Sequence, residues 1–219
     1  MRLRVVLFTL LLTGWTLLLG VLFLPFLLLP RGCFRKPRLL WVSGVLLLVR
    51  LVLGISWQLA GIQPTGTFIL AAQHQSALET FILARLYPDA AFVLKRELLW
   101  IPIFGWYLWK TQPIALNRKA GAAALRRLAH GAGKSQRSLI IFPQGTRQAQ
   151  GAAVRVLPGI ALLAEQTGLP VIPLTLNTGV FWPKNIVNAK SGRATLEFHP
   201  ALPPLSGRKL VNELAGLFS

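Results

Sequence analysis

Residues 67–86 read TFILAAQHQSALETFILARL, and this stretch decides the class of fold. Thr67–Ala72 is a short apolar run that predicts a buried strand, and Ala77–Leu86 has apolar residues at helical spacing. The polar residues between them therefore form a strand-to-helix loop. A strand followed directly by a helix indicates an α/β sandwich.

Two scarce residue types stand close together here. The chain has 3 histidines and 6 acidic residues beside 24 lysines and arginines. His74 lies in the predicted loop, and Glu79 lies in the first turn of the predicted helix. From there the carboxylate can turn back onto the imidazole, fix its tautomer and stabilise the imidazolium that forms when the ring takes a proton. The pair predicts a dyad that activates a hydroxyl group.

A second interpretation of the same residues needs no catalysis. Ser76 to Glu79 has the Ser-x-x-Glu pattern of a capping box, with Ser76 at the N-cap and Glu79 at N3. The spacing alone leaves both interpretations open.

Apolar runs continue to alternate with helical patterns from Ile55 onward. Further strands are predicted at Ile55–Leu59, Ala91–Leu94, Gln112–Leu116, Ser138–Phe142, Val171–Leu176 and Ala194–Phe198, and further helices at Arg118–His130 and Leu157–Gln166. This order predicts a largely parallel sheet flanked by helices, which we place in a domain at residues 58–219.

The region before this domain, residues 1–57, predicts membrane-embedded helices. Val5–Pro30 holds no charged residue and is longer than the roughly 20 residues that cross a hydrocarbon core. A cleaved signal peptide would have a shorter apolar core and a small-x-small cleavage site. Neither feature is evident here, so we expect this segment to remain in the protein as an anchor. The cations that follow form the kind of cluster that binds anionic headgroups and stays cytoplasmic. They are Arg31, Arg35, Lys36 and Arg38.

Leu39–Trp57 is apolar again except for Arg50. This segment can cross the membrane, form the return arm of a hairpin, or lie in the interface with Arg50 reaching the headgroups. The sequence leaves the three arrangements open.

The composition favours lipid as the partner of this chain. A net charge of +18 favours anionic partners, and 53% hydrophobic residues favour anionic membrane phospholipid among them. We expect no nucleic acid, because the aromatic residues lie in apolar runs instead of alternating with cations. Cys33 is the single cysteine and allows neither an internal disulfide nor a zinc cluster. No metal and no organic cofactor is implied.

Phe142–Arg147, with the sequence FPQGTR, follows a predicted buried strand. Its turn therefore lies at the carboxyl end of the strand, where open α/β sheets bind ligands. Gly145 lets the backbone approach a ligand, and Arg147 offers a planar fork for two phosphate oxygens. An ordinary Pro-x-Gly turn with a solvated arginine is the alternative.

Lys95 and Arg96 stand beside a very apolar, aromatic-rich stretch that extends to Tyr107. The stretch predicts either a headgroup-level interface with cations on phosphate, or a core helix with a basic end. Gly131–Ser135 imitates the end of a phosphate-binding P-loop. We exclude that motif because its first glycine would fall on Leu128 and because the stretch follows a predicted helix.

In this order and spacing, the stretches resemble the lysophosphatidic acid acyltransferase family, the 1-acylglycerol-3-phosphate O-acyltransferases. The resemblance covers about residues 55–200 and has four blocks. The family's His-x4-Asp motif falls on His74–Glu79, its basic block ending in Pro-x-x-Gly on Lys95–Gly105, its Phe-Pro-Glu-Gly-Thr-Arg block on Phe142–Arg147, and its Val-x-Pro-Val-type strand on Val171–Leu174.

The resemblance implies a glycerolipid acyltransferase-like fold and a reaction. An acyl group would pass from acyl-CoA or acyl-carrier protein to the 2-hydroxyl of 1-acyl-sn-glycerol-3-phosphate, a lysophosphatidic acid, to give phosphatidic acid. It implies a membrane enzyme, in the cell inner membrane or its equivalent, with the catalytic domain facing the cytoplasm.

The resemblance also implies roles for individual residues. His74 would be the base and Glu79 its orienting carboxylate. Lys95 and Arg147 would contact the acceptor phosphate, and Gly145 would shape the pocket. The remaining substrate-binding positions are Arg96, Gly105, Gln144 and Thr146.

Two residues depart from the family pattern. Glu79 stands for Asp, which adds a methylene, so the loop or the helix must adjust by about an ångström. Gln144 stands for Glu, which keeps size and hydrogen bonding but loses a negative charge that can influence the choice of acceptor. A different lysolipid acceptor, or a non-catalytic protein that binds anionic lipid, are the alternatives.

Overall fold

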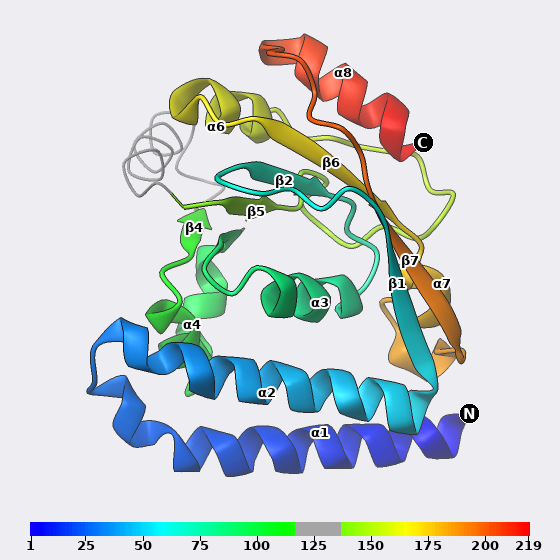
Figure 1. Ribbon diagram of the computed structural model, residues 1–219. Coiled ribbons are helices and arrows are strands. Elements are labelled where there is room, and N and C mark those ends of the chain that lie inside the picture. Colours follow the sequence, from blue (N-terminus) through cyan, green and yellow to red (C-terminus); the bar gives the residue numbers. More distant parts are fainter. Residues whose placement is uncertain (117–136) are drawn as a thin grey trace.

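The computed structural model describes residues 1–116 and 137–219 (Figure 1). The predicted helix Arg118–His130 and the P-loop-like Gly131–Ser135 lie outside the described residues. The described strands form a seven-stranded sheet in the order β1-β7-β6-β2-β5-β3-β4. Their bounds are β1 Ile55–Gly61, β2 Ile69–Ala72, β3 Ala91–Lys95, β4 Ile114–Leu116, β5 Leu139–Ile141, β6 Val171–Leu176 and β7 Gly192–Phe198. Every predicted strand is present, with small shifts at the ends.

Five neighbouring strands run parallel to one another. β6, β2, β5, β3 and β4 are joined by parallel pairings, whereas β7 runs antiparallel to β6 and carries β1 parallel to itself. The carboxyl ends of the five parallel strands therefore meet at one edge of the sheet. That edge is where open α/β sheets bind ligands.

Helices cover both faces of the sheet, which explains why its central strands are almost wholly apolar. Ile69 and Ala71 pack in the core with α6 (Gly159–Thr167) and α8 (Gly207–Phe218). Leu70 points to the other face, into the core that holds α3 (Leu78–Leu86). Figure 1 shows α6 and α8 on one side of the sheet and α3 on the other. The predicted fold class is confirmed.

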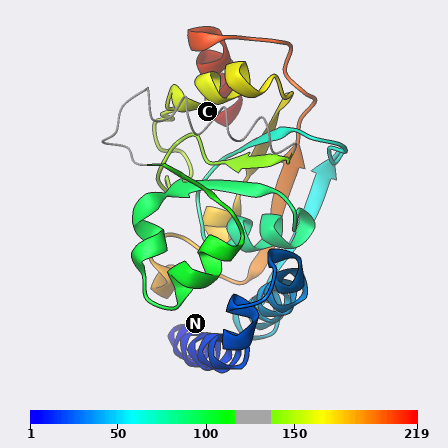
Figure 2. The ribbon, with the colours of Figure 1, turned by 90° about the vertical axis from the view of Figure 1, so that its left-hand side faces the viewer.

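The N-terminal region forms a helical hairpin beneath α3 (Figures 1 and 2). Its arms are α1 (Arg2–Leu22) and α2 (Arg35–Leu48), joined through the 3-10 turns Leu24–Leu27 and Arg31–Phe34. The uncharged run Val5–Pro30 is thus not one helix. α1 ends ahead of Pro25, which lacks an N–H donor and disfavours helical backbone in the residue before it.

Tryptophans hold the hairpin together and fasten it to the domain. Trp15 Nε1 donates to the Trp41 carbonyl at 3.1 Å, and Trp41 Nε1 donates to Thr16 Oγ1 at 3.2 Å. Trp41 also meets Phe81 of α3 edge to face at 5.7 Å between ring centres, and Phe8 meets Trp182 at 5.3 Å. The hairpin is therefore part of the same hydrophobic core as one face of the sheet.

One arm of the hairpin has the length and hydropathy of a membrane-spanning helix. Within the described residues, α1 is the one helix long and apolar enough to cross a membrane, and little of it is buried. α2 runs on through a π-turn at Val49–Leu53, and β1 begins at Ile55 after Gly54. How the hairpin lies relative to a membrane stays a prediction.

α4 (Phe104–Lys110) follows the 3-10 turn η4 (Arg96–Trp100), and the predicted core helix in this stretch is wrong. Gly105 is the one buried residue of α4, while Phe104, Trp106 and Trp109 are exposed. The reason is that α4 packs against the turn of the hairpin instead of the sheet, with Tyr107 stacked on Phe34 at 5.5 Å. The exposed aromatic rings fit the interface interpretation.

The sequence analysis predicts no element after Phe198, yet α8 is a regular helix. Its buried residues Leu210, Leu214 and Phe218 recur at a helical spacing, so the signal was present in the sequence. The two remaining short helices are α7 (Thr178–Phe181) and η5 (Ile186–Asn188).

The hairpin packing makes a testable prediction at Gly44. A methyl group there would overlap the Trp15 indole, whereas at Gly14 it would meet nothing within 4 Å. Alanine in a helix interior is more favourable than glycine by roughly 1 kcal/mol. We expect Gly14→Ala to raise the free energy of unfolding by about that amount, and Gly44→Ala to lower it by about 1–3 kcal/mol. Denaturant unfolding in detergent measures both, and equal effects would contradict close packing of the hairpin.

Candidate active site

The carboxyl edge of the sheet gathers predicted site residues from three strands and one further residue, Thr178, from a fourth. The loop with His74 follows β2, and the Phe142–Arg147 block follows β5. Lys95 ends β3, and Thr178 follows β6. Because these strands are parallel neighbours, segments far apart in the sequence converge at this edge.

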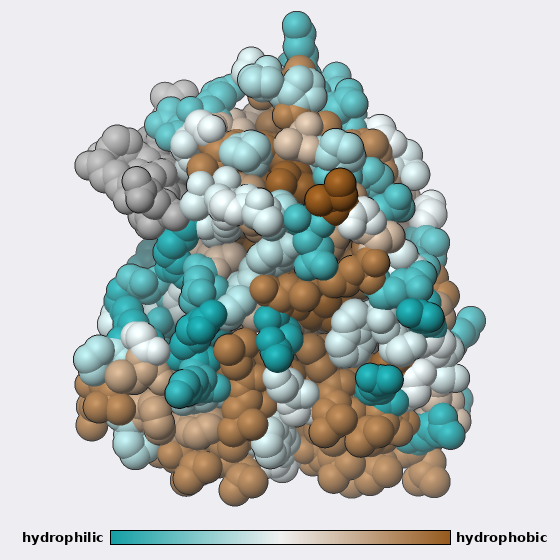
Figure 3. Space-filling model, in the orientation of Figure 1, coloured by the Kyte–Doolittle hydropathy of each residue, from teal (hydrophilic) through white to brown (hydrophobic). Residues whose placement is uncertain are grey.

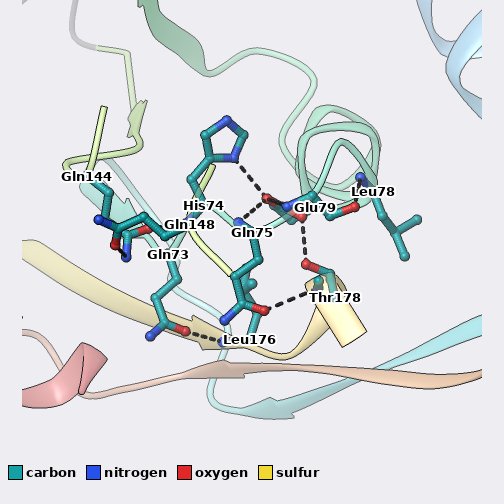
Figure 4. Close-up of polar contacts among 11 residues, drawn as sticks. Gln73, His74, Gln75, Leu78, Glu79, Gln144, Gln148, Leu176 and Thr178 are labelled. Atoms are coloured by element: carbon teal, nitrogen blue, oxygen red, sulfur yellow. Dashed lines mark hydrogen bonds and ion pairs between the residues drawn. The ribbon is translucent and has the colours of Figure 1, made fainter. Parts of the chain in front are cut away.

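His74 and Glu79 form the predicted pair (Figure 4). The imidazole Nδ1 lies 2.9 Å from the Glu79 Oε1 atom. The Glu79 side chain is fully buried, whereas the His74 side chain is 21% exposed. The other ring nitrogen, Nε2, points away from the carboxylate (Figure 4). The imidazole therefore has one nitrogen, Nδ1, bound to the buried carboxylate and the other, Nε2, directed away from that carboxylate.

The same carboxylate also caps the helix. Glu79 Oε1 accepts hydrogen bonds from the backbone N–H groups of Gln75 at 2.9 Å and Ser76 at 2.7 Å. Ser76 Oγ accepts from the N–H of Leu78 at 3.0 Å. The helix begins at Leu78 with Ala77 at its N-cap, so the prediction of Ser76 as N-cap is wrong by one residue. Capping and histidine contact are thus properties of one side chain, not alternatives.

Thr178 completes the surroundings of Glu79, and the sequence analysis missed it. Its Oγ1 donates to Glu79 Oε2 at 2.7 Å, and its side chain is fully buried. A buried carboxylate is costly unless its oxygens are hydrogen-bonded, and here both oxygens are. Thr178 comes from the end of β6, about 100 residues further along the chain, so no local pattern could reveal the contact.

The Phe142–Arg147 block holds the His74 loop. The His74 ring stacks on Phe142 with ring centres 4.2 Å apart. Gln144 Oε1 accepts from the His74 backbone N–H at 2.6 Å, and Gln144 Nε2 donates to Gln148 Oε1 at 2.6 Å. The Gln148 N–H in turn donates to the His74 carbonyl at 2.8 Å. Gln144 is therefore in contact with the loop that carries the histidine.

Two further glutamines on either side of His74 were also missed. Gln73 accepts from the N–H of Leu176 at 2.9 Å and donates to the Phe218 carbonyl at 2.8 Å. Gln75 accepts from the N–H of Gly179 at 3.2 Å. These bonds tie the loop to β6, α7 and the last turn of α8. In the sequence, the one indication of these contacts is that an amide side chain stands on each side of the candidate base His74.

Three of the predicted substrate-binding residues are cations with no counterion among the described residues. Lys95 and Arg96 are exposed and Arg147 is half-buried. Among the described residues, none of the three side chains forms an ion pair or a hydrogen bond. Lys95 is the last residue of β3, and Arg147 lies in the segment that follows the neighbouring parallel strand β5. Both therefore bring positive charge to the same edge of the sheet as His74. Such groups suit an anionic ligand.

The predicted glycines have different surroundings. Gly145 closes a turn by donating to the Phe142 carbonyl at 2.9 Å, and its φ of 73° is one that glycine adopts readily. Thr146 beside it is exposed. Gly105 instead lies on α4, where an added side chain would overlap the Leu99 backbone. Its visible contact is with the η4 turn, and a direct role in substrate binding stays a prediction.

Comparison with known proteins finds similar acyltransferases. The model of the acyltransferase family matches residues 58–177. A 1-acyl-sn-glycerol-3-phosphate acyltransferase from Pseudomonas aeruginosa is 36% identical over 188 residues, which cover 83% of this chain and 73% of that protein. A protein of the same name from Cocos nucifera is 31% identical over 135 residues, covering 59% of this chain and 44% of that protein.

The fold has a match among solved structures. The crystal structure of the 1-acyl-sn-glycerophosphate acyltransferase PlsC from Thermotoga maritima superposes with a TM-score of 0.73 at 25% identity, covering 99% of this chain and 96% of that chain. The coverage includes the N-terminal hairpin as well as the sheet. The chain therefore belongs to the acyltransferase family, among the 1-acyl-sn-glycerol-3-phosphate acyltransferases.

Proposed function

We propose that this enzyme moves a fatty acyl group from acyl-CoA or acyl-carrier protein to the 2-hydroxyl of 1-acyl-sn-glycerol-3-phosphate. The product would be phosphatidic acid. The single observation that carries the proposal is the 2.9 Å contact between His74 and the buried Glu79, at the edge where Lys95 and Arg147 lie. A base and a group of cations are what transfer to a phosphorylated alcohol requires.

The proposed reaction assigns a role to each nitrogen of His74. The Glu79 carboxylate, which can only accept a hydrogen bond, receives one from Nδ1–H, and the lone pair then lies on Nε2. Nε2 takes the proton of the acceptor hydroxyl while its oxygen attacks the thioester carbonyl. The buried carboxylate stabilises the imidazolium formed in this step. The C–S bond then breaks, and the proton passes from His74 to the thiolate that leaves. No acylated enzyme is needed.

The longer side chain at position 79 is accommodated by its surroundings. Glu79 still reaches Nδ1, because two backbone N–H groups fix Oε1 and Thr178 fixes Oε2. We propose that Thr178 is a positioning residue for this carboxylate. The substitution of Glu for the family's Asp is therefore compatible with activity.

Gln144, the second departure from the family pattern, has a hydrogen-bond partner in its own segment. Gln144 donates through Nε2 to Gln148 Oε1, a bond that a carboxylate at position 144 could not donate. We propose that Gln144 fixes the position of the His74 loop through its hydrogen bond to the His74 N–H. It would influence the choice of acceptor indirectly, through the position of that loop. This makes a lysolipid other than lysophosphatidic acid the second candidate acceptor.

We also propose that residues 1–57 anchor the enzyme in the inner membrane, or its equivalent, with the domain 58–219 on the cytoplasmic side. The supporting observation is the apolar surface of the hairpin and α4. Figure 3 shows hydrophobic residues gathered over α1, at the base of the molecule. Exposed apolar side chains include Leu3, Leu10, Leu17, Val21, Trp106 and Trp109. Anionic phospholipid is the proposed surrounding lipid.

His74→Ala tests the base directly. We expect thiol release from long-chain acyl-CoA to depend on lysophosphatidic acid, and to fall by about 10²-fold or more in the variant, because its general base is gone. The measurement is free-thiol release by the purified, detergent-solubilised protein, repeated with acyl-carrier protein as donor. Membrane association should not change. His199→Ala is the matched control, since that ring contacts Thr175 away from the dyad. Full activity of His74→Ala would remove it from the mechanism.

Glu79→Gln separates capping from catalysis. The amide oxygen can keep the contacts to the Gln75 and Ser76 N–H groups, and its Nε2 can donate to Thr178 Oγ1. It cannot supply the negative charge that stabilises the imidazolium. We expect a loss of kcat of about 10²-fold or more with the thermal unfolding temperature little changed. Glu165→Gln, which also changes an acceptor of a backbone N–H, is the control. Unchanged kcat in Glu79→Gln would leave capping as the sole role.

Arg147→Gln tests the phosphate contact. Loss of one charge-assisted hydrogen bond of about 1.5–3 kcal/mol would lower kcat/KM for lysophosphatidic acid by roughly 10- to 150-fold. A monoacylglycerol, which has no phosphate, should react equally well with both proteins. The exposed Arg155 provides the control substitution to glutamine. An equal loss with both acceptors would show that Arg147 does not recognise phosphate.

A further inference from the structure

Four arginines gather at the opposite edge of the sheet from His74. Arg31 and Arg35 lie at the turn of the hairpin and the start of α2, and Arg38 follows one turn later. Arg137 comes just before the amino end of β5, and Asp89 just before the amino end of β3. Parallel strands have their amino ends on one edge and their carboxyl ends on the other. This group, here called the arginine cluster, is therefore separate from the catalytic edge.

Among the described residues, Asp89 is the one carboxylate that interacts with the arginine cluster. Arg35 Nε lies 3.1 Å from Asp89 Oδ1 in an exposed ion pair. Arg137 Nε donates to the backbone carbonyl of Asp89 at 2.8 Å, so it uses a neutral acceptor. Its remaining nitrogens donate to the Thr111 carbonyl at 3.3 Å and to Gln112 Oε1 at 3.5 Å. Asp89 can balance one of the four positive charges.

Arg38 is the least satisfied member of the cluster. Its Nε atom is buried and has no hydrogen-bond partner within residues 1–116 and 137–219. Burial lowers the pKa of Arg38, nearby Asp89 opposes this, and Arg137 and Arg35 lower it further. Burial likewise lowers the pKa of Arg137, with Asp89 opposing and Arg31 adding to the effect. Arg38 and Arg137 are therefore partly dehydrated, and each lies close enough to other guanidinium groups of the cluster to be repelled by them.

A bound anion would remove two unfavourable features of the arginine cluster, the unpaired N–H of Arg38 and the repulsion between guanidinium groups. It would accept the unpaired N–H of Arg38 and offset the repulsion among the guanidinium groups. The planar fork of arginine matches two oxygens of a phosphate group, and several forks together favour phosphate over a single carboxylate.

The surroundings of the cluster indicate which phosphate. Arg31 lies over the Trp109 ring at 5.0 Å, and Lys110 Nζ donates to the Leu29 carbonyl at 2.9 Å. Leu28, Leu29 and Trp109 are exposed. Figure 3 shows hydrophilic residues over the start of α2, directly above the apolar base. Cations beside exposed apolar and indole side chains are typical of the headgroup level of a membrane.

We propose that Arg31, Arg35, Arg38 and Arg137 form a binding site for the phosphate group of an anionic membrane phospholipid. The site lies apart from the acceptor site and does not depend on the proposed reaction. Its ligand is a component of the membrane that the enzyme lies against, and binding there would fix the turn of the hairpin and the edge of α4 relative to the bilayer surface.

The test measures the thermal unfolding temperature of the full chain in a neutral detergent. A short-chain phosphatidylglycerol should raise it by about 4 °C or more, because a ligand that binds only the folded state stabilises it. Phosphatidylcholine of the same chain length should not. Sodium chloride at matched ionic strength controls for screening, and inorganic phosphate is the arm without acyl chains.

Arg38→Met is the decisive variant, and Arg208→Met, an exposed arginine in the first turn of α8, is its control. We expect Arg38→Met to unfold no earlier than the parent protein without lipid, because repulsion is relieved, and to lose the rise caused by phosphatidylglycerol. Arg208→Met should keep that rise. If Arg38→Met destabilises the protein equally with and without lipid, the arginine is structural and the proposal is wrong.

Two further arms complete the test. Arg35→Gln, at an exposed position, should also reduce the lipid-induced rise if Arg38→Met does not fold. A rise with inorganic phosphate that equals the rise with phosphatidylglycerol would overturn the assignment to lipid. The His74→Ala protein should show the full rise, so failure of this site and failure of the proposed reaction are distinguished by separate measurements.

Discussion

The structure depends on the burial of one carboxylate. Glu79 has no contact with water, and its two oxygens receive hydrogen bonds from His74, from two backbone N–H groups and from Thr178. Because a buried charge is tolerated only when it is fully hydrogen-bonded, the loop after β2, the start of α3 and the residue after β6 must meet there. The cap of the helix and the orientation of the histidine follow from that single requirement.

The other polar contacts of the site serve the same loop. Gln73 and Gln75 fasten it to β6, α7 and α8, and Gln144 with Gln148 fastens its backbone to the segment after β5. These side chains are neutral amides, which can donate and accept at once, so they join backbone groups without adding charge beside the dyad. A side chain held from several elements needs little rearrangement when a ligand binds, which suits the proposed role of His74 as the base.

Positive charge is divided between the two edges of the sheet. Lys95, Arg96 and Arg147 lie at the carboxyl edge, near the dyad, whereas the arginine cluster lies at the amino edge beside the hairpin turn. The exposed Trp109 of α4 lies against Arg31 of the second group. These two groups of cations lie at opposite edges of the sheet, so they are suited to separate anionic ligands.

The sequence by itself determined the strands, the α/β class, the family resemblance and the His74–Glu79 pair, because these depend on local periodicity and on short spacings. It missed α8, took α4 for a possible core helix, and could not reveal Thr178, the glutamine contacts or the grouping of Arg38 with Arg137 and Asp89. The spacing of Leu210, Leu214 and Phe218 does indicate α8, whereas the other features were decided by tertiary structure alone. The order of the strands sets which loops become neighbours, and no local pattern contains that order, so contacts between residues about 100 positions apart appear only when the sheet is assembled.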